Sequence, residues 1–161
     1  MRDSACAECG APLESGRSCR DYFHELLALE AEVPGGPGGE PHFFAVASYN
    51  LQHPSQFVPG ALVGLHRTVA DVLALRATTA DALRRARFGA SGATQVRRRP
   101  DTHVSASDRA LLERWPTRWA FTVRDALAGG VSHYAERVRA WASAVVAALD
   151  PIATPPPTNK G

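Results

Sequence analysis

The sequence is poor in several features that would place it in a familiar class of protein. Its 161 residues include one methionine and a single lysine, Lys160, so arginine supplies nearly all of the positive charge. No apolar run reaches the roughly 18 residues that a membrane span requires, and the N-terminus lacks the apolar segment of a secretory signal. We therefore expect a cytoplasmic protein that has no contact with a membrane.

Charge and cysteine content further narrow the classes of protein to which the chain could belong. A formal net charge of +2 is close to neutral and does not by itself indicate a nucleic-acid partner. Three cysteines are an odd number, and in a reducing compartment they favour metal or redox chemistry over a disulfide framework. The length suits one domain, which we expect over residues 1–150, followed by a disordered, proline-rich tail over 151–161.

The cysteines lie close together near the N-terminus. Cys6-Ala-Glu-Cys9-Gly10 has the C-x-x-C-G pattern of a metal-binding knuckle, in which the glycine permits the backbone twist that follows the second thiolate. A redox pair and plain cysteines without a bound metal are the alternatives. Redox pairs open a helix after a strand, and neither is evident here. Cys19 follows Ser18, which forms a capping box with Asp21, so Cys19 is expected in the first turn of a helix, where a thiolate is favoured.

Capping boxes and helical periodicity predict an all-α fold, a small bundle of five or six helices with an N-terminal zinc knuckle at residues 6–19 and no sheet. Longer helices are expected over residues 19–32, 42–53, 61–76 and 132–149. Shorter ones should open at Thr78 and Thr122, with one or two further turns after Ser105 or Ser107.

The helix over residues 42–53 carries an unusual stripe. His42, Val46, Tyr49 and His53 share one face, and three of the four have polar or ligand-capable side chains. At about 1.5 Å per residue the two histidines lie roughly 16 Å apart, so they cannot bind the same metal ion. The helix therefore offers two separate polar sites, one at each end.

A short connector rich in glycine and proline, residues 33–41, predicts that this helix packs antiparallel to the one before it. That arrangement brings His53 to Cys19 and His42 to Glu30. We therefore predict a structural Zn²⁺ site whose ligands are Cys6, Cys9, Cys19 and His53. The main rival of His53 as fourth ligand is His66, followed by His42.

A second polar site is predicted from the charged pair that Glu30 and His42 should form, with further polar side chains on the neighbouring helical turns. Its members are Glu30, His42, Tyr49 and His66. His66 could equally be a core histidine satisfied by one hydrogen bond. Six arginines lie between Arg84 and Arg99, where a solvated loop is favoured over a phosphate contact because no aromatic residues interleave.

These motifs together resemble a family of small bacterial proteins known as a domain of unknown function. The resemblance covers Cys6 to Leu149, and the cysteines with Gln52-His53-Pro54 are its most specific part. It implies that the cysteine and histidine positions belong to one site, and it implies no reaction.

Three functional classes follow from the sequence. The first is a zinc-stabilised helical domain that binds an unknown protein or small-molecule partner. The second is a metal-dependent helical-bundle enzyme, a transferase or hydrolase, that uses Glu30, His42, Tyr49 and His66. The third, a nucleic-acid-associated protein that uses the arginine-rich segment, is disfavoured by the low net charge.

Overall fold

The computed structural model describes residues 4–34, 36–91 and 96–153, and the predicted all-α fold is confirmed. The described residues form seven α-helices rather than five or six, because two short capped segments are complete helices. Their bounds are α1 Cys19–Leu29, α2 Gly39–Gln52, α3 Pro59–Leu73, α4 Thr79–Ser91, α5 Ala106–Glu113, α6 Val123–Leu127 and α7 Tyr134–Ala153. Three 3-10 turns, Glu30–Glu32, Pro54–Gln56 and Val131–His133, follow α1, follow α2 and precede α7.

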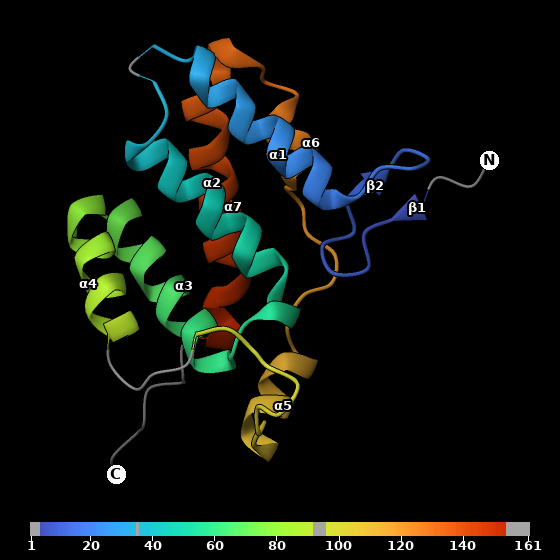
Figure 1. Cartoon of the computed structure of the whole chain (residues 1–161), viewed down its shortest axis with the longest axis vertical. Helices are drawn as coiled ribbons and strands as arrows, with labels where there is room; N and C mark the ends of the chain where they lie inside the picture. The colour runs from blue at the N-terminus through green and yellow to red at the C-terminus, as the bar shows by residue number, and fades with distance from the viewer. Residues whose placement is uncertain (1–3, 35, 92–95, 154–161) are drawn as a thin grey trace.

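Helices α2 and α7 form the centre of the bundle (Figure 1). α1 and α6 pack beside them on one side, and α3 with α4 lies on the other. α7 buries one stripe at helical spacing, which consists of Tyr134, Val138, Trp141, Val145 and Leu149. α2 is buried on several sides because α1, α3 and α7 all contact it.

Two helices are longer than predicted. α2 begins at Gly39, three residues before His42. α7 continues past Leu149 to Ala153, although Pro151 lies inside its last turn. Ala153 is buried one turn beyond Leu149, so the same apolar stripe extends through residues expected to belong to the tail. Residues 154–161 of the predicted tail lie outside the described part of the chain.

Two short stretches of strand pairing were not expected from the sequence. β1 (Ser4–Ala5) pairs antiparallel with β2 (Pro12–Leu13), which closes the cysteine knuckle into a small ribbon. In the arginine-rich segment, α4 extends to Ser91, and an antiparallel bridge then joins Arg97 to Phe57. Both pairings are formed by backbone hydrogen bonds, which leave no signature in side-chain periodicity.

Among the described helices, none has the length and apolar character needed to cross a membrane.

Candidate metal centre

The knuckle is a tight turn that the β1–β2 ribbon closes. The Cys6 N–H donates to the Ala11 carbonyl at 2.9 Å, and the Gly10 N–H donates to the Cys6 carbonyl at 2.8 Å. Gly10 has a φ of 74°, and a Cβ at this position would lie 3.3 Å from the Arg118 Cα and from the Thr117 carbonyl oxygen. Glycine is therefore needed here both for the left-handed backbone and for the close approach of the 117–118 segment.

Helix α1 delivers the third thiol. Ser18 caps the helix: its hydroxyl accepts from the Asp21 N–H, and the Asp21 carboxylate accepts from the Ser18 N–H at 2.7 Å. The predicted capping box is thus confirmed, and Cys19 is the first residue of α1. Its side chain is buried with its sulfur 3.5 Å from the Cys9 sulfur. A disulfide bond would require about 2.05 Å, so these two thiols are unbonded neighbours.

His53 arrives at the same place from the end of α2. The helix ends at Gln52, and Pro54 begins the following 3-10 turn. The His53 Nδ1–H donates to the Tyr49 carbonyl oxygen at 2.7 Å, which leaves Nε2 facing the Cys6 sulfur at 3.5 Å. A hydrogen bond at one ring nitrogen that orients the other is the usual support of a metal-binding histidine.

The four donor atoms match the size of a tetrahedral metal site. The three sulfurs and one imidazole nitrogen all lie within 4.8 Å of one another. A zinc ion with Zn–S about 2.3 Å and Zn–N about 2.0 Å separates its sulfurs by about 3.8 Å and sulfur from nitrogen by about 3.5 Å. The observed Cys9–Cys19 and Cys6–His53 separations, each 3.5 Å, are close to these values. The cluster could hold a metal ion.

The proton-binding properties of the cluster reflect this crowding. The hydrogen bond from the Cys19 thiol lowers the pKa of Cys9 to about 4, although burial opposes the shift. The same hydrogen bond and burial raise the pKa of Cys19, and burial raises the pKa of Cys6. Burial opposes a charge on His53, but its hydrogen bonds with Cys9 and the Tyr49 carbonyl outweigh burial and raise its pKa. Without a metal, the Cys9 thiolate is therefore surrounded by protonated side chains. A divalent cation could displace the protons of these neighbours.

Residues outside the donor set hold the two halves of the centre together. Glu8, between the two knuckle cysteines, accepts from the Ser55 N–H at 3.0 Å, just beyond His53. The Trp115 indole N–H donates to the Leu51 carbonyl at 2.8 Å, and the Gln52 amide donates to the Phe121 carbonyl at 2.7 Å. None of these three contacts was expected from the sequence, because each joins residues at least 47 positions apart.

Tyr49 belongs to this end of the hairpin. Its ring stacks between His53, with centroids 4.1 Å apart, and Phe23, with centroids 4.0 Å apart. Burial, with a smaller contribution from the nearby cysteines, raises the pKa of Tyr49, so its hydroxyl stays protonated. Tyr49 therefore supports the imidazole by ring contact.

The members of the predicted second polar site do not assemble in one place. Glu30 and His42 do pair, since the His42 Nδ1–H donates to Glu30 Oε2 at 2.8 Å. The Tyr134 hydroxyl donates to the other Glu30 oxygen, a contact that the sequence did not reveal. Tyr49 lies about 10 Å along α2 from His42. His66 is buried and hydrogen-bonded to Asp150 at 3.0 Å, as a core histidine with one partner would be.

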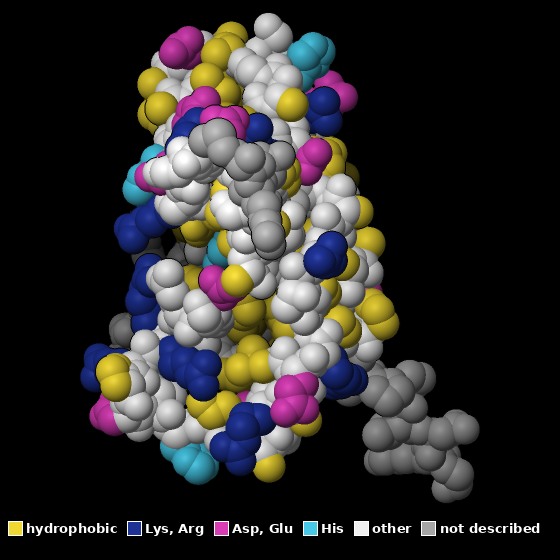
Figure 2. Space-filling model, turned by 90° about the vertical axis from the view of Figure 1, so that its right-hand side faces the viewer, with side chains coloured by type: hydrophobic (Ala, Val, Ile, Leu, Met, Phe, Trp, Pro, Cys, Tyr) yellow, Lys and Arg dark blue, Asp and Glu magenta, His cyan; other side chains and the backbone are white. Residues whose placement is uncertain are grey.

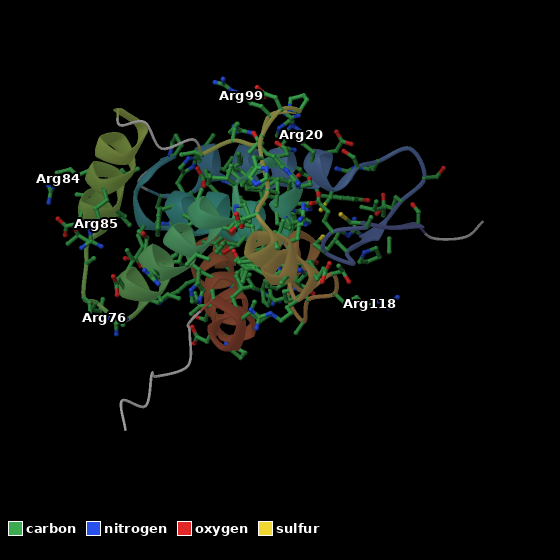
Figure 3. All side chains as sticks on the ribbon, turned by 90° about the horizontal axis from the view of Figure 1, so that it is seen from below. Arg20, Arg76, Arg84, Arg85, Arg99 and Arg118 are labelled. Atoms are coloured by element: carbon green, nitrogen blue, oxygen red, sulfur yellow. The ribbon has the colours of Figure 1, made fainter. Side chains whose placement is uncertain are left out.

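The arginines are dispersed over the surface. In Figure 3 the labelled side chains point outward from separate parts of the molecule, with Arg76, Arg84 and Arg85 far from Arg118. On the face shown in Figure 2, basic side chains alternate with acidic and apolar ones. Asp71 pairs with Arg76 and Arg85, and Asp81 pairs with Arg84. The labelled arginines thus lie in separate places, and three of them pair with acidic side chains.

Comparison with known proteins gives one family match. The model of a family described as a family of unknown function (DUF5946) matches residues 4–150, which include all four donors of the candidate metal centre. No curated protein and no solved structure matches the chain.

Proposed function

Because the chain belongs to DUF5946, a family of unknown function, we propose its role from the geometry: it is a zinc-stabilised helical domain that binds a partner molecule. Cys6, Cys9, Cys19 and His53 are the ligands of one structural Zn²⁺ ion. The observation that carries this proposal is the convergence of their four donor atoms within 4.8 Å.

The donor chemistry favours zinc over other divalent ions. Three sulfurs and one imidazole nitrogen suit a soft or borderline metal with tetrahedral geometry, whereas magnesium and calcium prefer oxygen ligands. A Cys₃His set fills all four positions of such an ion and leaves none for a substrate. This is the arrangement of a structural site, and it supports binding as the role in preference to metal catalysis.

The metal-dependent enzyme is the weaker alternative. Its four candidate residues divide into a Glu30–His42 pair, a Tyr49 ring stacked on His53, and a His66 bonded to Asp150. No group of three or more potential metal ligands other than the Cys₃His cluster occurs among the described residues. A second metal site at Glu30 would therefore have no third ligand beside Glu30 and His42 from this part of the chain.

Elemental analysis of the purified, reduced protein tests the proposal. We expect one zinc per chain in the wild type and in His66→Ala, and a loss of zinc in His53→Ala. His24→Ala, which alters an exposed histidine on α1, is the matched control and should retain full zinc content. Full stoichiometry in His53→Ala together with a loss in His66→Ala would reassign the fourth ligand, and a wild type without any metal would refute the site.

A further inference from the structure

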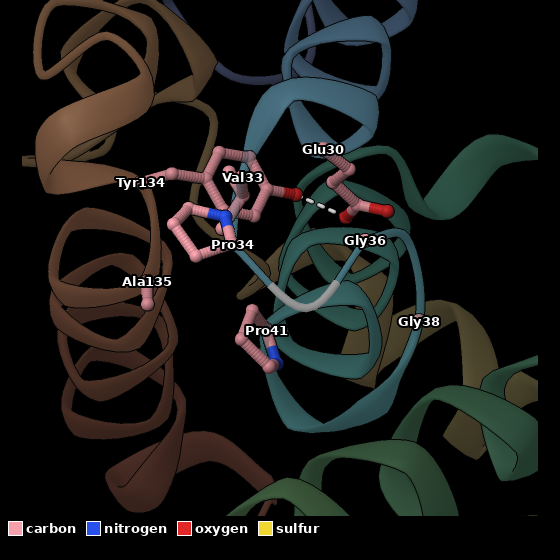
Figure 4. A pocket seen from close by; sticks show the side chains of 8 residues that line it. All are labelled: Glu30, Val33, Pro34, Gly36, Gly38, Pro41, Tyr134 and Ala135. Atoms are coloured by element: carbon pink, nitrogen blue, oxygen red, sulfur yellow. Dashed lines mark hydrogen bonds between the residues drawn. The ribbon is translucent and has the colours of Figure 1, made fainter.

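At the opposite end of α1 from Cys19, a cavity of about 230 Å³ opens beside Glu30 (Figure 4). The end of α1, the connector to α2 and the start of α7 supply its walls. Among the residues that line it are Glu30, Val33, Pro34, Pro41, Tyr134 and Ala135. Since α1 rises about 1.5 Å per residue, the cavity lies about 16 Å from the metal centre.

The walls are largely apolar, with one charged group. Val33, Pro34, Pro41 and Ala135 present hydrocarbon, whereas the Glu30 carboxylate lies at one end with only 4% of its side chain exposed. A buried carboxylate is costly unless charge and hydrogen bonds compensate it. A small cavity with apolar walls and one convergent polar group has the general character of a ligand site.

The partners of Glu30 do not use its full capacity. The Tyr134 hydroxyl donates to one carboxylate oxygen and the His42 imidazole to the other. Burial and this hydrogen bond raise the pKa of Tyr134, so the phenol remains a donor. A carboxylate accepts about four hydrogen bonds, so each oxygen retains a free lone pair.

Glu30 has a single ion-pair partner among the described residues. Its ion-pair partner is His42, whose side chain is 45% exposed, and an imidazole is positive only when protonated. Among the described residues no arginine forms an ion pair with Glu30; Arg139, for example, pairs with Glu40. The cavity thus combines a nearly buried carboxylate, which has remaining acceptor capacity, with apolar walls.

We propose that this cavity binds a small primary alkylammonium ion, with the ammonium group on the Glu30 carboxylate and the alkyl chain against Val33, Pro34, Pro41 and Ala135. A primary ammonium supplies a positive charge and several N–H donors. The inference builds on the binding role proposed above by naming a ligand class, but the cavity shares no residue with the metal centre.

The test is an NMR titration of the zinc-loaded, full-length protein with n-butylammonium, with n-butanol and tetramethylammonium as comparison ligands. We expect n-butylammonium to bind more tightly than either, by about tenfold or more, because only it has both charge and donors. Glu30→Gln should remove this preference. Equal affinity for n-butanol or tetramethylammonium, or no saturable shift with n-butylammonium, would overturn the proposal.

A pair of exposed substitutions keeps the test valid if Glu30→Gln fails to fold. Ala135→Phe should fill the cavity mouth and weaken n-butylammonium binding, whereas Ala140→Phe, at another exposed alanine of α7, should leave it unchanged. Equal affinities in the two variants would contradict the assigned cavity. Zinc content measured on the same samples separates the two proposals, since loss of amine binding with zinc retained rejects only this one.

Discussion

Removing zinc should release the N-terminal arm, residues 4–18, and leave the helical bundle folded. Ordering these residues costs on the order of 15 kcal/mol at about 1 kcal/mol each. The arm buries few apolar side chains, chiefly Cys9, Ala11 and part of Leu13, and makes a handful of hydrogen bonds. Together these offset about 10 kcal/mol. The arm alone is therefore short by about 5 kcal/mol, and structural zinc contributes about 10 kcal/mol or more.

Hydrogen exchange measured by mass spectrometry, with and without a zinc chelator and with thiols kept reduced, would detect this release. Amides of the knuckle, including those of Cys6 and Gly10, should lose their protection on chelation, whereas those of α7 should keep it. Far-UV circular dichroism should change little, because the arm contains no helix. Slow exchange of the Cys6 and Gly10 amides in metal-free, reduced protein would refute the reasoning.

Two further outcomes follow from the geometry of the centre. Zinc affinity should rise with pH near neutrality, by about two to three logarithmic units per pH unit. Cys6 and Cys19, whose pKa values are raised, must each release a proton, and His53, whose pKa is also raised, must release its proton where it carries one, while Cys9 is already a thiolate. Competition with a chelator at several pH values measures this, and a flat profile would contradict the assignment. Gly10→Ala should lower the free energy of unfolding in urea more than Gly16→Ala does. Both glycines have positive φ and share a backbone cost of about 1 kcal/mol, but only at Gly10 does the added methyl group meet the 117–118 segment. Equal losses of stability would show that the close approach of the 117–118 segment to Gly10 is not constrained.

Local signals in the sequence were sufficient to predict much of the centre. The Ser18–Asp21 capping box places Cys19 at the start of a helix, and the structure confirms this. The short connector forces the α1–α2 hairpin to be antiparallel, which brings His53 toward Cys19 and His42 toward Glu30. These positions are predictable because capping, helical rise and short connections act within about 35 residues of chain.

Long-range partners could not be predicted in the same way. Periodicity shows that Glu30 and His66 face inward, but it does not show that Tyr134 and Asp150 meet them. Both partners come from α7, 84 or more residues along the chain, and its position depends on packing against α2 and α3. The same limit explains why the contact between Trp115 and the end of α2 was missed.

The stacking of Tyr49 between Phe23 and His53 has a consequence for motion. A half-turn of the Tyr49 ring about its own axis would drive its edges into both neighbours, whose centroids are only 4.0 and 4.1 Å away. Each flip must therefore wait for a transient opening that moves either the α1 face or the His53 imidazole. The frequency of that flip measures how often the metal centre and the hairpin loosen, and a zinc ion that immobilises His53 would slow it.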